Sequence, residues 1–193
     1  MVPSQYAGSQ MDAIESRRVN TEKEAVSLFE SACSRLLAVN EWENYAGISA
    51  FKLINPQGIH AERPAQVDDY IRIDIPGPGS RAGMGYDWVR IESILGINDA
   101  KKQLLLMTVR PCGHPLSKAD EVAHFLKSEA TSTFMIKRNG LFVSAEEHGR
   151  NEMPNTDNGS FYDNSRNFVV GIAAKLGLSY PQWKSLVKGL LKD

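Results

Sequence analysis

The sequence predicts an α+β fold, in which a curved or partly closed antiparallel β-sheet of about six strands packs against N-terminal, middle and two C-terminal helices. Residues 48–110 hold consecutive stretches of strand-like alternation, with no helical pattern between them. Helical periodicity is found instead at residues 21–40, 117–129 and 165–191. Strands that follow one another directly favour an antiparallel sheet with helices gathered on one side, rather than a doubly wound parallel sheet.

The composition is that of an ordinary globular protein. The chain has 193 residues, 42% hydrophobic and 23% charged, with a formal net charge of −1. That length suits one substantial core. We therefore expect a single α+β domain over residues 20–193, preceded by a poorly ordered tail over residues 1–19, where no periodicity is sustained.

Several classes of protein are disfavoured by what the sequence lacks. No run of Lys or Arg provides the positive patch that nucleic acid requires, and no apolar run is long enough to span a membrane. The N-terminus shows no secretory signal. Cys33 and Cys112 lie far apart and are expected to be reduced, so the cytoplasm is the expected location.

The first helix has a clear start. Thr21 and Glu24 form a capping box, in which the hydroxyl caps a backbone amide and the carboxylate reaches back to the cap. Apolar residues then recur at helical spacing as far as Asn40. Trp42 and Tyr45 follow closely and are expected to seal the edge of the core.

Four strands are predicted next, at residues 48–54, 69–75, 86–95 and 103–110. Two of them carry charged residues on one face, and that face either lies in solvent with ion pairs or lines a cavity. The charged residues are Arg72, Asp74, Arg90 and Glu92. The Gly-rich loop at 76–85 is followed by a strand rather than a helix, which argues against a phosphate-binding loop.

A β-hairpin is predicted around Asn139–Gly140, because this dipeptide suits a two-residue type I′ turn. That turn would place Ile136 opposite Val143. Alternation then assigns one set of side chains to the core face. The set is Phe134, Ile136, Leu141, Val143 and Ala145.

Helices surround this hairpin. Ser117 can cap a middle helix running to about Glu129, and two helices close the chain. The first of these stops at Gly177, and the second begins with a capping box of Ser179 and Gln182. A long strand series closed by a C-terminal helix resembles the helix-grip ligand-binding proteins. Since a helix precedes the first predicted strand and no diagnostic residues match, no family is assigned.

Polar residues crowd the segment 148–155, HGRNEMPN, directly after the hairpin. His148 can exchange protons near neutral pH, and Arg150 can bind a carboxylate or phosphate. Glu152 could orient His148 or act as a base itself. Further polar residues begin a later helix and extend the cluster. The predicted ligand-binding residues are His148, Arg150, Asn151, Glu152, Asn155, Arg166 and Asn167.

The favoured function is the binding of a small molecule, anionic because of Arg150, in a pocket bordered by residues 148–155. One alternative is a hydrolase or isomerase with His148 and Glu152 as its acid–base pair. Others are a protein-interaction module that uses Trp42 and Tyr45, and a solvated, self-capping loop. No catalytic motif or metal-ligand spacing is recognised, and neither a cofactor nor an oligomeric state is indicated.

Overall fold

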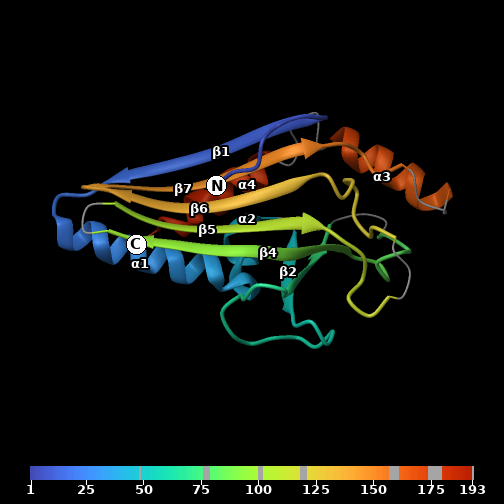
Figure 1. Ribbon diagram of the computed structural model, residues 1–193, viewed down its shortest axis with the longest axis horizontal. Coiled ribbons are helices and arrows are strands. Elements are labelled where there is room, and N and C mark those ends of the chain that lie inside the picture. Colours follow the sequence, from blue (N-terminus) through green and yellow to red (C-terminus); the bar gives the residue numbers. More distant parts are fainter. Residues whose placement is uncertain are drawn as a thin grey trace.

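The computed structural model describes residues 1–47, 49–75, 79–99, 102–117, 121–156, 161–173 and 180–192. Figure 1 shows its elements. The strands are β1 Ser9–Arg18, β2 Ala50–Ile54, β3 Tyr70–Asp74, β4 Asp87–Asn98, β5 Lys102–Pro111, β6 Thr131–Asn139 and β7 Phe142–Glu152. The helices are α1 Glu22–Leu37, the 3-10 helix η1 Val39–Glu41, α2 Glu43–Ala46, α3 Phe161–Ala173 and α4 Tyr180–Leu190. None of these described helices is long and apolar enough to cross a membrane.

The strands form one antiparallel sheet in the order β1-β7-β6-β5-β4-β3-β2, which confirms the predicted α+β class. The sheet has seven strands instead of six because residues 9–18 form β1. The prediction of a poorly ordered tail is therefore wrong for this stretch, which pairs with β7 from Arg18 to Ser9. Only Ala13 is fully buried in β1, so the strand lacks the apolar alternation that reveals most strands.

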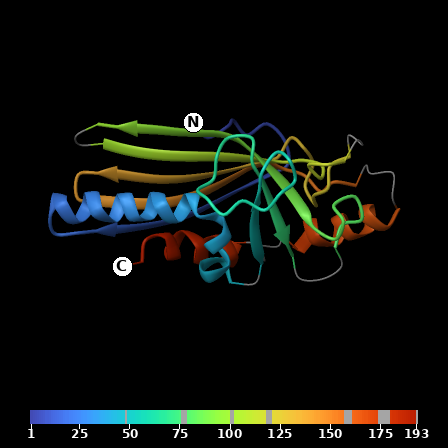
Figure 2. The same cartoon turned by 90° about the horizontal axis from the view of Figure 1, so that it is seen from below.

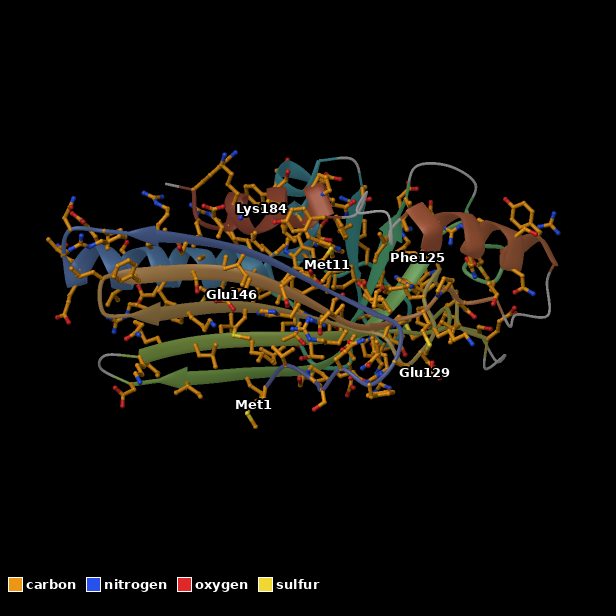
Figure 3. The ribbon with its side chains drawn as sticks, turned by 90° about the horizontal axis from the view of Figure 1, so that it is seen from above. Met1, Met11, Phe125, Glu129, Glu146 and Lys184 are labelled. Atoms are coloured by element: carbon orange, nitrogen blue, oxygen red, sulfur yellow. The ribbon has the colours of Figure 1, made fainter. Side chains whose placement is uncertain are left out.

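The sheet separates two layers. Figures 2 and 3 show α1 and α4 on one face, while the N-terminal segment with Met1 lies on the opposite face. Both halves of the capping box predicted at Thr21 and Glu24 are present at the start of α1. Gly177 and Ser179, predicted to end α3 and begin α4, lie outside the described residues.

The core fills the space between the sheet and these two helices. Trp42 packs against Phe134 and Phe51, with ring centroids 4.9 and 5.5 Å apart. Trp183 of α4 approaches Phe134 from the other side at 5.5 Å. The indole N–H of Trp42 donates to the Leu36 carbonyl, so this buried aromatic keeps its hydrogen bond. Trp42 therefore belongs to the core and not to an exposed patch.

The β6–β7 hairpin has four of the five predicted core residues and a different turn. The fifth, Leu141, lies in the turn and is only half-buried. Phe134, Ile136, Val143 and Ala145 are all buried in the core. Ile136 pairs with Ala145 rather than Val143, because the two loop residues are Gly140 and Leu141. Of these two, only Gly140 has positive φ, at 58°, whereas a type I′ turn needs positive φ at both central positions.

The predicted middle helix is wrong for residues 121–129, which are not helical; residues 118–120 lie outside the described chain. The backbone here bonds to neighbouring strands instead. The Ala123 carbonyl accepts from the Trp88 amide at 2.8 Å, and the Lys127 amide donates to the Met153 carbonyl at 2.9 Å. Local helical periodicity was overridden by these tertiary hydrogen bonds.

On the charged face, Arg90 and Glu92 of β4 pair with residues outside the predicted set, Arg72 of β3 lies over the Tyr86 ring, and Asp74 is exposed. Arg90 bonds Asp68 at 2.6 Å, and Glu92 bonds Arg110 at 2.5 Å. These four side chains are 34–57% exposed, so the pairs are solvated and contribute little stability, typically below about 1 kcal/mol.

Candidate functional site

The polar segment predicted to follow a strand lies mostly within one, since β7 continues to Glu152. Alternation therefore sends neighbouring side chains to opposite faces of the sheet. Glu147 is paired with Ala13 and Phe134, which are core residues, so it faces the helices. His148 faces the other way, toward the layer that holds the N-terminal segment.

On that outer face, His148 lies between two carboxylates from different strands. Its Nδ1 is 2.5 Å from Oδ1 of Asp12, and its Nε2 is 2.9 Å from Oε2 of Glu146. Glu146 also pairs with Lys137 at 2.8 Å. The hydrogen bond to Glu146, followed by that to Asp12, raises the pKa of His148 against the opposing effect of burial. Burial acts to raise the pKa of Glu146, but its partners, His148 first, lower it to about 2.

This arrangement predicts that His148 stabilises the fold as an imidazolium. A raised folded-state pKa gives stability that is complete below the unfolded pKa of about 6.5 and is lost as pH rises through the folded value. His148→Gln should therefore cost about 1–3 kcal/mol at pH 6 and clearly less at pH 9, measured by urea unfolding. An equal cost at both pH values would contradict a charged His148. His60→Gln, at an exposed histidine, is the control.

Arg150 and Asn151 use their polar groups on the chain itself. Arg150 bonds Oδ1 of Asp12 at 2.7 Å and the Gly149 carbonyl at 2.7 Å. Asn151 stands at a bulge with φ 56°, and its Oδ1 accepts from the amides of Tyr6 and Ala7 at 2.8 and 3.1 Å. Together these two side chains hold β1 and the N-terminal segment onto β7.

The remaining predicted residues, other than Glu152, form a second cluster near α3. Arg166 forms an ion pair with Asp87, with its guanidinium nitrogen 2.8 Å from Oδ1, and both side chains are almost completely buried. Asn167 donates to the Asn155 carbonyl at 2.9 Å, and Asn155 donates to the His124 carbonyl at 3.1 Å. The structure thus brings Asn155, Arg166 and Asn167 together, but around Asp87 and not around His148.

Burial governs the ionisable groups of this second cluster. It raises the pKa of Asp87 to about 6, although the charge of Arg166 opposes it. It lowers the pKa of His124 to about 3, and Arg166 adds to that effect. Sequence reasoning missed Asp87. The available signal was a carboxylate next to the apolar pair Trp88 and Val89 at the start of a strand, where burial calls for a cationic partner.

A third group of ionisable residues, Glu147 and Glu152, lies on the helix-facing side of the sheet. Sequence reasoning also missed Glu147. Glu147 is completely buried, and in the described part of the chain neither of its carboxylate oxygens has a hydrogen-bond partner. Burial, and next the charge of Glu152, raises the pKa of Glu147 well above its usual value, although Ser132 acts to lower it. Burial also raises the pKa of Glu152. The hydrogen bonds of His148 go to Asp12 and Glu146, so the predicted acid–base pair with Glu152 gains no support.

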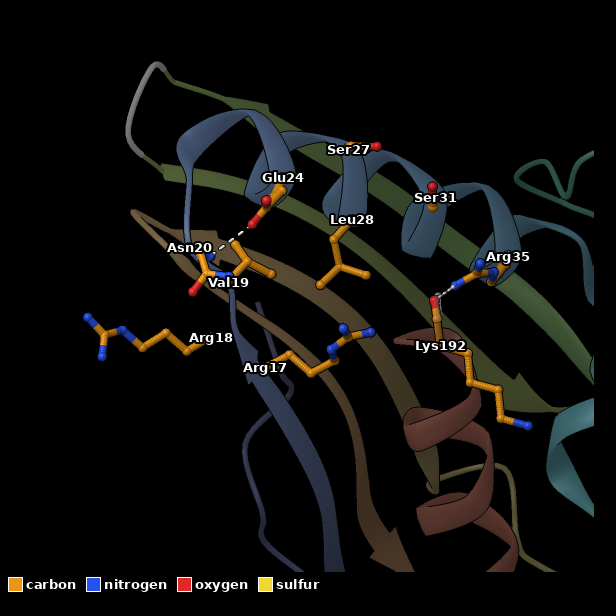
Figure 4. Close-up of a pocket in the computed structure, with 10 residues that line it drawn as sticks. All are labelled: Arg17, Arg18, Val19, Asn20, Glu24, Ser27, Leu28, Ser31, Arg35 and Lys192. Carbon is orange, nitrogen blue, oxygen red and sulfur yellow. Dashed lines mark hydrogen bonds between the residues drawn. The ribbon is translucent and has the colours of Figure 1, made fainter.

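A hollow of about 380 Å³ lies elsewhere, between α1, the end of β1 and the end of α4; we call it the basic pocket (Figure 4). Arg17 donates to the Leu191 carbonyl at 2.6 Å, and Arg35 donates to the Leu190 carbonyl at 3.0 Å. The lining residues are Arg17, Arg18, Val19, Asn20, Glu24, Ser27, Leu28, Ser31, Arg35 and Lys192. In Figure 4, Arg17 and Arg35 lie in the space between α1 and α4, whereas the side chains of Arg18 and Lys192 extend away from it. The Arg18 guanidinium lies over the Phe142 ring, 5.9 Å from its centroid.

Comparison with known proteins finds distant structural similarity but no match in sequence. No protein-family model and no curated protein matches the sequence. A hypothetical protein of Helicobacter pylori is similar in structure, with 12% identity, 92% of this chain and 86% of the other covered, and a TM-score of 0.47. Major latex-like protein 151 of Panax ginseng is similar with 12% identity, 87% and 98% covered, and a TM-score of 0.34. Ara h 8.0201 is similar with 9% identity, 93% and 99% covered, and a TM-score of 0.37.

With TM-scores below 0.5, function has to be argued from the side chains of this chain. The described residues contain no group of three or more His, Cys, Asp or Glu that could hold a metal ion. Within the group of His148, Asp12, Glu146 and Arg150, the polar side chains bond to one another. The same holds for the second cluster, around Asp87 and Arg166. In the described part of the chain, polar groups border a hollow at the basic pocket, and both carboxylate oxygens of Glu147 are buried without a hydrogen bond, whereas Glu152 accepts from the Ser9 hydroxyl.

Proposed function

We propose that the protein binds a small anionic ligand in the basic pocket. The observation that carries this proposal is the pair of guanidinium groups, Arg17 and Arg35, at a hollow of about 380 Å³, which is within the size range of small-molecule sites. Its one carboxylate, Glu24, is already committed: it accepts from the backbone amide of Asn20 at 2.9 Å as part of the helix cap. The local field therefore favours an anion.

The cationic groups are also held in place before any ligand arrives. Arg17 and Arg35 bond the carbonyls that end α4, where the helix dipole is negative. A guanidinium has five N–H donors in a rigid fork, so Arg35 can bond these carbonyls and still offer donors to a carboxylate or phosphate. Val19 and Leu28 add an apolar wall for the uncharged part of the ligand.

This location differs from the one expected from the sequence, which placed an anionic ligand beside residues 148–155. Arg150 was the reason for that expectation, and its guanidinium is engaged by Asp12 and by two backbone carbonyls. A small anionic ligand is therefore still proposed, but its binding site is the basic pocket and not the surroundings of Arg150. The interaction-module alternative named Trp42 and Tyr45; Trp42 is buried, and Tyr45 is half-buried and packs against the core.

Arg35→Gln tests the proposal, with phenyl phosphate as the probe in isothermal titration calorimetry. The amide can still donate to an α4 carbonyl, but the charge is removed. Losing a charge-assisted hydrogen bond of about 1.5–3 kcal/mol should weaken binding by about tenfold or more.

Arg110→Gln is the matched control, because Arg110 also donates to a backbone carbonyl, that of Ser128, far from the pocket. It should bind phenyl phosphate as the wild type does. The proposal fails if the wild type does not bind phenyl phosphate, or if both variants lose the same affinity.

A further inference from the structure

The second half of β4 is an open edge of the sheet. β3 pairs with β4 only as far as Arg90, and a loop covers one further residue, since the Ile91 carbonyl accepts from the Asp68 amide at 3.0 Å. Over residues 93–98, β5 is the one strand of the described chain that pairs with β4. Figures 1 and 2 show this half of β4 at the boundary of the sheet, away from β2. Its outward backbone groups can therefore pair with another strand.

The two end strands of the sheet are protected in ways that this segment is not. β1 is rich in charged residues, and the Lys184 side chain donates to the Ile14 carbonyl. β2 has only five residues, and the bridge between Ile54 and His60 covers part of its outer side. Charges and short strands are common means by which sheet edges avoid pairing with another chain. The segment 93–98, SILGIN, contains neither a charged residue nor a proline.

Two apolar side chains of this segment lie exposed on the outer face of the sheet. Leu95 pairs with Leu106, which pairs with Met135 and, through it, with Glu146 beside His148. Ile97 follows Leu95 on the same face. Leu95 is 53% and Ile97 58% exposed, whereas Leu106 and Met135 are buried. Apolar side chains on an open edge favour association with a further strand.

We propose that a second copy of this chain pairs antiparallel with residues 93–98, so that the two sheets join across a two-fold axis at Gly96. In that register Leu95 of each copy lies opposite Ile97 of the other, and this apolar pair forms twice. Alternation keeps both side chains on the outer face in both copies. The register of β4 against β5 is regular from Ser93 to Asn98, so the segment is straight enough to continue the ladder.

A second copy suits this edge because the segment is complementary to itself. A two-fold axis sets the strand against its own sequence, and an uncharged segment then brings no like charges together. The formal net charge of −1 gives two copies little mutual repulsion. α1 packs beneath β6 and β7 and so leaves the space beneath this edge clear. Gly96 adds no side chain at the axis, where even a Cβ would meet only the Leu104 carbonyl, at 3.9 Å.

The experiment is sedimentation velocity of the full chain over a concentration series. One strand pair is a small interface, so we expect a reversible dimer with a dissociation constant on the order of 1–100 μM. Leu95→Lys should weaken the dimer by about tenfold or more, because each ammonium group would lie against an isoleucine. Ile14→Lys is the matched control, since Ile14 is 47% exposed on the same face but at the opposite edge of the sheet, and it should associate as the wild type does.

A mixture of two variants tests the register itself. Ile97→Glu alone should also be monomeric. In a mixed dimer of Leu95→Lys and Ile97→Glu, the two-fold places the new lysine opposite the new glutamate and keeps the native Ile97–Leu95 pair at the other position. The mixture should therefore regain association that neither variant shows alone, which also demonstrates that both variants are folded.

Three outcomes overturn the inference. A wild type that stays monomeric throughout the series leaves the edge to an extended segment of another protein. Equal losses in Ile14→Lys and Leu95→Lys would place the interface elsewhere, and a mixture that stays monomeric would exclude this register. The inference is independent of the anion-binding proposal, because residues 93–98 do not line the basic pocket and Leu95→Lys should bind phenyl phosphate as the wild type does.

Discussion

Arg166→Met is expected to lower the free energy of unfolding by about 3–5 kcal/mol, measured by urea denaturation with tryptophan fluorescence. The substitution keeps much of the side-chain volume but removes the counter-ion of Asp87. The Asp87 side chain is completely buried and that of Arg166 is 3% exposed, so water cannot replace the lost partner. The unpaired carboxylate then bears its full desolvation penalty.

Two comparisons show whether this loss comes from the buried charge. Arg110→Met breaks the exposed pair with Glu92 and should cost less than about 1 kcal/mol. Adding Asp87→Asn to Arg166→Met should recover part of the loss, since the uncompensated charge is then absent. The cost of Arg166→Met should also shrink as pH falls toward 6, because removing Arg166 raises the pKa of Asp87 above its value of about 6 and the orphaned carboxyl takes up a proton. A cost equal to that of Arg110→Met would contradict the buried ion pair.

The elements that the sequence predicted well are those whose stability is local or strongly periodic. The capping box of Thr21 and Glu24 needs only four consecutive residues, and it forms as predicted. The core face of the β6–β7 hairpin follows from period-two alternation, and it survived an error in the turn because the true register kept the same faces.

The elements that were missed are stabilised by distant partners. β1 has one fully buried residue and is held by pairing with β7, more than a hundred residues later. Residues 121–129 have helical periodicity, but their backbone forms hydrogen bonds with Trp88 and Met153 instead of helical ones. Neither Trp88 nor Met153 can be inferred from the local pattern, since both are distant in sequence from the residues they bond.

The candidate site shows the same division. The sequence correctly singled out a run of polar residues, but it treated them as one cluster following a strand. Because β7 continues through Glu152, alternation divides them between two faces, and the bulge at Asn151 changes the direction of the chain beyond it. Glu147 went unnoticed because a charged residue in a strand is usually solvent-facing, and only the pairing with Ala13 and Phe134 places it in the core.

Glu147→Gln is expected to make the protein more stable at alkaline pH, which is unusual for a core substitution. The unfolded carboxyl titrates near its usual pKa of 4.5, and burial raises the folded value well above that. Stability from this group is therefore complete below the unfolded pKa and is lost as pH rises through the folded pKa, at up to about 1.4 kcal/mol per pH unit. Glutamine cannot ionise, so the variant avoids that loss.

The measurement is urea unfolding of both proteins from pH 4.5 to pH 9, with the difference in unfolding free energy plotted against pH. That difference should grow in favour of Glu147→Gln as pH rises, whereas it should stay flat for the exposed control Glu62→Gln. His148 also loses stability over this range, but it does so in both proteins and cancels in the difference. Parallel curves would contradict a protonated Glu147.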